Sequence, residues 1–221
     1  MPYPMIHMEI AYQVSGRFDR IKKKGDFLLG SVAPDAVHFH EKYDVHQKEI
    51  SHVWDCGPIW GVTLESEKWI DHIRIFWKEH KKDAARDFIA GYCVHLLTDW
   101  MNDQRMWAPF RERIVQGADY NVIYANSKYR EEAYGFDQWL YQTNAHTAEI
   151  WKLLAEGQVY ELPGYILAED LARQKQSLLT EQYAGKKCYD IGKYEYYTKD
   201  IIDSFIGECI KLISEEMFDR L

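Results

Sequence analysis

A histidine and an aspartate four residues apart, His95 and Asp99, are the side chains of this sequence best placed to do chemistry. On a helix, residues i and i+4 lie one above the other on the same face. An imidazole and a carboxylate placed in this way converge on one point, as the ligands of a metal ion must. A buried histidine hydrogen-bonded to an aspartate is the commoner use of such a pair, so the pair alone does not establish a metal site.

Four of the nine histidines of the chain crowd into a single stretch of 15 residues. Histidine-rich segments are typical of metal binding, although a polar surface loop would explain them too. His52 has the most apolar neighbours of the four and is the best ligand candidate. His38 comes second, because it would lie one turn beyond Asp35 if a helix begins there. We expect the other two, His40 and His46, at the surface.

Two further candidates lie nearer the start of the chain. His7 belongs to a segment with helical periodicity, residues 5–14, where a surface histidine is an equally good interpretation. Asp35 follows Pro34, and proline suits the first position of a helix. Asp35 should therefore open a turn or a helix, where a carboxylate that only caps the helix would also explain it.

The elements that must hold these residues are predicted to be helices, because apolar residues recur at helical spacing and strict alternation is scarce. Gly91, inside the apolar helix of His95, indicates close approach by another backbone or by a ligand. No internal repeat or linker is visible, so we expect one all-α domain, a multi-helix bundle spanning residues 1–221. The expected helical segments are residues 5–14, 18–29 with a break at Gly25, 67–80, 87–106, 107–116, 121–156 with an interruption near Gly135, 167–183 and 194–221.

Composition narrows the classes of function. The chain has 221 residues, 47% of them hydrophobic, and a formal net charge of −8 without a long basic run, which disfavours stable binding to nucleic acid. No secretory signal or transmembrane segment is visible. The cysteines are widely scattered, which fits a reducing compartment, and we expect a cytoplasmic protein. They are Cys56, Cys93, Cys188 and Cys209.

The ordered set of these motifs resembles the zinc-dependent phospholipase C family, which is related to the single-strand-specific zinc nucleases. The stretches that carry the resemblance are IHMEIA around His7, FLLGSVAPDAVHF around Asp35, KEISHVWD around His52 and DFIAGYCVHLLTDWMND around His95 and Asp99. Together they span about the first half of the chain. The central helix and the Gly-x-x-x-Pro-Asp stretch are the more specific pair, whereas the match at His7 is weak alone.

The resemblance implies a ligand set. Asp35, His52, His95 and Asp99 would hold one zinc ion, and Asp99 would bridge to a second ion that His7 also binds. Asp35 would in addition be the catalytic residue, orienting or deprotonating the attacking water.

The chain departs from the family at the third metal. The family has a histidine shortly after the bridging aspartate, and residues 100–106 contain none. Its later His-x-x-x-Glu pair is matched here only by His146 and Glu149, one residue closer together. We therefore expect one or two zinc ions rather than three, leave other divalent metals open, and keep His38, His146 and Glu149 as possible additional site residues.

The function expected from the resemblance is hydrolysis of a phosphodiester by a metal-activated water, which would make the protein a zinc-dependent phosphoric ester hydrolase. Its substrate would be a small-molecule or lipid phosphoester, and nothing in the sequence specifies the ester or the oligomeric state. Two alternatives stay open. One is an HD-type metallophosphohydrolase, although the adjacent His-Asp pair of that superfamily is missing. The other is a non-catalytic metal-binding or structural module of the same fold.

Overall fold

The structure is a computed structural model that describes residues 2–83, 85–114, 127–185 and 187–219. Within these ranges the chain forms helices, and β structure is limited to an isolated bridge between Leu162 and Ile166. The prediction of a single all-α domain is thereby confirmed. The elements are α1 (Pro4–Arg17), α2 (Lys24–Gly30), η1 (Ala33–Phe39), α3 (Val45–Ser51), α4 (Ser66–His80), α5 (Arg86–Asn102), η2 (Asp103–Trp107), α6 (Ala108–Ile114), α8 (Lys128–Thr143), α9 (Thr147–Glu156), α10 (Ala168–Thr180), η3 (Ile191–Lys193), α11 (Lys199–Ile213) and η4 (Ser214–Asp219).

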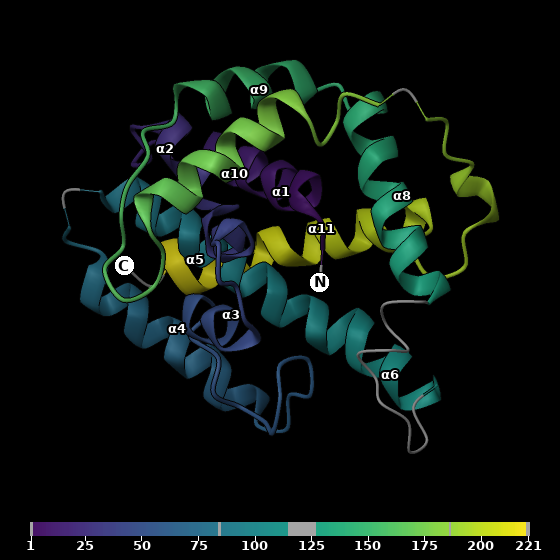
Figure 1. The fold of residues 1–221 in the computed structure, drawn as a ribbon, viewed down its shortest axis with the longest axis horizontal. Helices are drawn as coiled ribbons and strands as arrows, with labels where there is room; N and C mark the ends of the chain where they lie inside the picture. Colours follow the sequence, from purple (N-terminus) through teal and green to yellow (C-terminus); the bar gives the residue numbers. More distant parts are fainter. Residues whose placement is uncertain (1, 84, 115–126, 186, 220–221) are drawn as a thin grey trace.

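Helix α5 is the centre of the bundle. Almost every side chain along it is buried, because its apolar residues cover the whole circumference rather than one stripe. Helices α1, α2, α4 and α11 and the short helix η1 all pack on it. Figure 1 shows α5 crossing the middle of the molecule, with α3 and α4 on one side and α9 and α10 on the other.

The contact between α2 and α5 is unusually close because each helix presents a glycine to the other. A Cβ atom on Gly91 would lie 1.9 Å from the carbonyl oxygen of Phe27, and one on Gly30 would lie 2.2 Å from that of Phe88. No side chain fits at either position. The close approach expected at Gly91 is therefore an approach of backbone to backbone.

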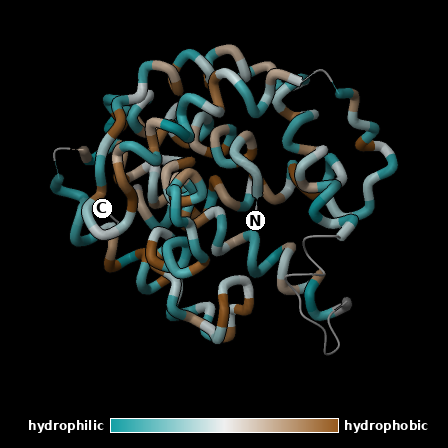
Figure 2. Tube along the Cα trace, in the orientation of Figure 1, coloured by the Kyte–Doolittle hydropathy of each residue, from teal (hydrophilic) through white to brown (hydrophobic). Residues whose placement is uncertain are grey.

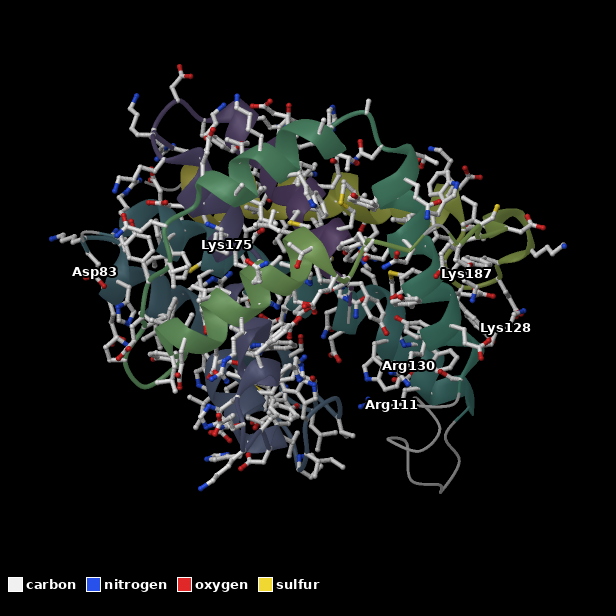
Figure 3. All side chains as sticks on the ribbon, turned by 45° about the horizontal axis from the view of Figure 1, so that its top comes forward. Asp83, Arg111, Lys128, Arg130, Lys175 and Lys187 are labelled. Carbon is white, nitrogen blue, oxygen red and sulfur yellow. The ribbon has the colours of Figure 1, made fainter. Side chains whose placement is uncertain are left out.

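The outer helices are amphipathic. Hydrophobic and hydrophilic stretches alternate along helices such as α9 in Figure 2, as expected for helices with one face on the core. Charged side chains such as Asp83 and Lys128 lie toward the edge of the molecule in Figure 3. Among the residues that the structure describes, no helix has the length and apolar character needed to cross a membrane.

Three predicted boundaries were wrong for identifiable reasons. Gly25 does not break a helix; it lies in the first turn of α2, which begins only at Lys24. Gly135 does not interrupt α8, since it is a packing position where a Cβ atom would lie 2.0 Å from the hydroxyl of Tyr194. The last helix, α11, begins at Lys199 rather than at residue 194. The predicted helical residues 115–116, 121–126 and 220–221 lie outside the described ranges.

Candidate metal centre

Four elements bring the five predicted ligands to one buried place. His7 lies on α1, Asp35 on η1, His52 at the end of α3, and His95 and Asp99 on α5. Two groups of three among them have ligand atoms close enough together to hold a metal ion. His7, His95 and Asp99 form one group, and Asp35, His52 and His95 form the other.

The spacing of the ligand atoms fits a small tetrahedral cation. Ligands that bind zinc at 2.0–2.1 Å with tetrahedral angles lie roughly 3.3 Å from one another. His52 Nε2 and His95 Nε2 are 3.2 Å apart, and they lie 3.3 and 3.4 Å from Asp99 Oδ2. Asp35 Oδ1 is 3.6 Å from His52 Nε2. The ligand atoms of His52, His95 and Asp99 are therefore spaced as ligands of one zinc ion, and Asp35 lies slightly farther out, with Oδ2 4.0 Å from His95 Nε2.

Backbone carbonyls fix the orientation of the imidazoles of His52 and His95. His95 Nδ1 donates to the carbonyl oxygen of Ser31 at 2.9 Å, and His52 Nδ1 donates to that of Lys48 at 2.9 Å. A carbonyl oxygen can only accept, so each Nδ1 carries the proton. Each Nε2 consequently presents its lone pair to the centre, which is the arrangement that backbone carbonyls impose on metal-ligating histidines.

The two oxygens of Asp99 face different partners. Oδ2 faces His52 and His95, whereas Oδ1 lies 3.5 Å from His7 Nε2. The ring of His7 stacks on that of His95 with 3.9 Å between the centroids. Neither oxygen of Asp99 and neither ring nitrogen of His7 has a hydrogen-bond partner, although both side chains are fully buried. Buried polar atoms without partners are costly and rare, and here they fit a cation on each side of the carboxylate.

Burial and neighbouring charges shift the pKa values of the imidazoles and carboxylates in the metal-free centre. Burial lowers the pKa of His7 and of His52 to about 4, so both rings stay neutral. Burial alone would raise the pKa of Asp99, but the surrounding imidazoles outweigh it and hold that pKa well below its usual range. Burial would lower the pKa of His95, but the carboxylates of Asp99 and Asp35 raise it. Without a cation the carboxylates therefore favour protonation of His95, and since Nδ1 already carries a proton the second one would lie on Nε2, which faces the centre.

Sequence reasoning missed Lys48, a nearly buried cation at the edge of the centre. Its Nζ lies 2.8 Å from Asp35 Oδ1 and 3.1 Å from His38 Nε2, and it sits 5.4 Å from the ring centroid of Trp60. Burial would raise the pKa of Asp35, but this ammonium and the neighbouring imidazoles hold it well below the usual value. The side chain of Asp35 is 20% exposed, whereas that of His52 is fully buried. Asp35 is therefore the most exposed of the candidate ligands, and the buried ammonium of Lys48 lies beside it.

A second missed residue is Asn102, one turn after Asp99 on α5. It is fully buried, and neither its amide nitrogen nor its amide oxygen has a hydrogen-bond partner. Residues three apart on a helix are neighbours on its surface, so this amide continues the polar stripe of His95 and Asp99. The spacing was readable in the sequence, but an asparagine near a helix end is normally explained as a cap.

Of the three possible additional residues, His146 and Glu149 are not brought into this group. His146 Nδ1 pairs with Glu9 at 2.9 Å, and the exposed Glu149 lies 3.7 Å from Lys152. His146 is the N-cap of α9 and Glu149 lies in the first turn of the same helix, and each side chain has a partner outside the centre. His38 does approach the centre, with Nε2 3.6 Å from Asp35 Oδ1. The remaining histidines have other partners: His40 pairs with Asp170, His46 with Glu49, His72 with the carbonyl of Val53 and His80 with Asp83.

Comparison with known proteins adds no relative: no protein-family model, no curated protein and no solved structure matches this chain.

Proposed function

We propose that this protein is a zinc-dependent hydrolase of phosphoric esters, with a phosphodiester as its substrate. The observation that carries the proposal is the meeting of three imidazoles and two carboxylates at one buried place, with Asp99 turning one oxygen to each side. This is also the ligand set that the resemblance to the zinc-dependent phospholipase C family implies. Three nitrogen and two carboxylate ligands suit zinc.

The electrostatics favour an anionic substrate once a cation is present. With Lys48 charged and the imidazoles neutral, the carboxylates of Asp35 and Asp99 leave the centre with a net negative charge. One divalent ion is enough to reverse that sign. A bound divalent ion would also lower the pKa of a water molecule and stabilise the oxygen that leaves phosphorus.

Individual residues of the chain would have separate roles in the reaction. Asp35, the ligand with the most exposed side chain, would orient the attacking water and accept its proton. Lys48 would offset the charge that develops on the phosphoryl oxygens, because its ammonium lies 2.8 Å from Asp35 Oδ1. Its bond to Asp35 keeps both groups in place before substrate arrives. Asn102 offers a buried amide that can donate to one further oxygen.

Hydrolysis of a chromogenic phosphodiester by the zinc-loaded protein tests the proposal. We expect turnover by the wild type and none by His95→Ala, which removes a ligand of both possible groups. Lys48→Gln should retain its metal but lose about 100-fold in kcat, as for one donor that stabilises transition-state charge.

His80→Ala is the matched control, because His80 lies on α4 and pairs with Asp83 away from the centre. It should hydrolyse the ester like the wild type. A wild-type protein that binds zinc but cleaves neither a phosphodiester nor a phosphomonoester would contradict the proposal and favour the non-catalytic alternative. Equal activity of wild type and His95→Ala would contradict it as well.

A further inference from the structure

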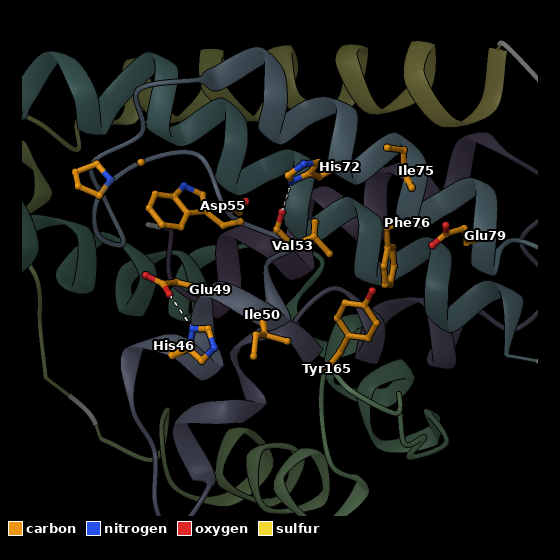
Figure 4. A pocket seen from close by; sticks show the side chains of 13 residues that line it. His46, Glu49, Ile50, Val53, Asp55, His72, Ile75, Phe76, Glu79 and Tyr165 are labelled. Atoms are coloured by element: carbon orange, nitrogen blue, oxygen red, sulfur yellow. Dashed lines mark hydrogen bonds and ion pairs between the residues drawn. The ribbon is translucent and has the colours of Figure 1, made fainter.

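Three successive backbone carbonyls around His52 are each held by a side chain of another helix. The carbonyl of Ser51 accepts from the hydroxyl of Tyr92 on α5. Those of His52 and Val53 accept from Trp69 Nε1 at 2.9 Å and His72 Nδ1 at 3.2 Å. Trp69 and His72 are three residues apart on one face of α4. Figure 4 shows the bond from His72 to Val53.

The turn that these bonds hold has an unusual residue type at the position after the helix C-cap. Helix α3 ends at Ser51 with His52 as its C-cap. The amide of Trp54 then bonds to the carbonyl of Glu49 at 2.9 Å and that of Val53 to the carbonyl of Ile50 at 3.0 Å. This pair of bonds is a Schellman motif, in which the residue after the C-cap adopts a left-handed conformation and is usually glycine.

Here that residue is Val53, with φ at +47°. It is the only non-glycine residue with a positive φ among the residues that the structure describes. A β-branched side chain is a genuine outlier in this region, since its Cβ crowds the following carbonyl. Such a conformation persists only where the surroundings over-determine it, and such positions cluster at functional sites.

The strained turn sets the direction of a candidate ligand. His52 is the C-cap, so its Cα–Cβ bond is aimed by the same dihedrals that the Schellman motif fixes. If Val53 relaxed to an extended conformation, the carbonyls would leave Trp69 and His72, and His52 would turn away from Asp35, His95 and Asp99.

We propose that His72 is a positioning residue for the metal centre. Its bond to the carbonyl of Val53 holds the left-handed turn, and the turn aims His52 at the cation. The inference rests on the metal centre of the proposed function but not on any hydrolytic activity. His72 faces an open cleft of about 490 Å³, also lined by Ile75 (Figure 4), so truncating it enlarges that cleft and leaves no new void in the core.

The test measures zinc affinity by competition with a chromophoric chelator. His72→Ala should bind zinc 10- to 100-fold more weakly than the wild type, the usual loss for a residue that supports a metal ligand. Glycine adopts the left-handed conformation without strain. The double variant His72→Ala/Val53→Gly should therefore recover most of the wild-type affinity. A residue with only a general structural role would not be rescued by this second change.

His80→Ala, two turns along the same helix, is the control and should leave zinc affinity unchanged. The d–d spectrum of the cobalt-substituted protein provides a second readout, with His72→Ala altered and the double variant restored. Wild-type affinity in His72→Ala would overturn the inference, and so would a loss that Val53→Gly does not restore. A wild type that binds zinc without cleaving any phosphoester would overturn only the proposed function, whereas one that binds no zinc would overturn both.

Discussion

Asp99 is a fully buried carboxylate whose nearest polar neighbours are three imidazoles at 3.3–3.5 Å. Two of those imidazoles direct lone pairs at it, because their protons are engaged by backbone carbonyls. An ionised group without charge compensation is among the most expensive features that a protein interior can hold. The arrangement is explained if a cation occupies the space between them when the protein functions.

The buried imidazoles make the stability of the metal-free protein depend on pH. The pKa of His7 and of His52 is about 4 in the folded protein, below the ordinary value of 6.5. At these two rings the unfolded chain therefore binds more protons between these values, and their contribution to folding stability falls as pH drops from about 6.5 toward 4. The carboxyls of Asp137 and Asp103, whose pKa burial raises to about 7 and about 6, act in the opposite direction over much of the same range. The contribution of His95, whose pKa is raised, changes only above pH 6.5.

Urea unfolding of the metal-free protein between pH 7 and 5 checks this expectation. On acidification His7→Gln should lose less stability, or gain more, than the wild type, because one of the two groups is gone. His80→Gln should match the wild type. A His7→Gln variant whose stability changes with pH as that of the wild type does would contradict the assignment of neutral buried rings.

Residue types and spacing predicted the five side chains that meet, since histidine and aspartate at fixed intervals are visible in any sequence. Lys48 was not predictable in the same way, because lysine is almost never buried without a partner, and its partner Asp35 is 13 residues away. The one available signal was its position four residues before His52, which places both on one face of α3.

At the scale of elements, the position of His95 depends on the contact between α2 and α5. The carbonyl of Ser31 that orients His95 directly follows α2, and it can reach α5 only because Gly30 and Gly91 let the two backbones touch. The geometry of a ligand is thus determined by two residues that carry no side chain.

Gly91→Ala should therefore damage both the fold and the site. Its Cβ atom would lie 1.9 Å from the carbonyl oxygen of Phe27, and backbone cannot be moved as cheaply as the end of a side chain. We expect a loss of stability of about 3 kcal/mol or more, at the upper end of the range for overpacking, together with weaker zinc binding.

Thermal unfolding and chelator competition measure the two effects of this change. Gly207→Ala is the matched control, because Gly207 lies within α11 with nothing near its Cβ position, and alanine there should be neutral or stabilising. Wild-type stability in Gly91→Ala would contradict the close backbone contact between α2 and α5 at this position.

Helix periodicity predicted most elements of the described chain but not what their glycines do. Gly25 and Gly135 were interpreted as breaks from composition alone, whereas Gly135 is a place where α8 accommodates Tyr194 from a distant loop. A glycine that serves packing and one that ends a helix look the same in a sequence, because the difference lies in a partner that is far away in the chain.

At the scale of the whole molecule, the first half of the chain supplies every candidate ligand and the second half encloses them. Helix α9 packs on α2, α10 on η1, α8 on α1 and α11 on α5. Asp137 on α8 accepts hydrogen bonds from the first turn of α1, at Met5 N (2.9 Å) and Ile6 N (3.3 Å), and so fixes the helix that carries His7. Periodicity in a sequence indicates a buried face but not which helix covers it, so the all-α class was predictable and this arrangement was not.

The central claim is that this fold holds a metal ion between Asp99 and the imidazoles around it. Its most direct test is the metal content of wild-type protein and of Asp99→Asn after equilibrium dialysis against zinc, measured by elemental mass spectrometry. Asparagine keeps the size of the side chain but loses the charge and the second anionic oxygen. We predict one or two tightly bound zinc ions per wild-type chain and none in Asp99→Asn; a wild type without zinc, or a variant that retains the wild-type content, would contradict the claim.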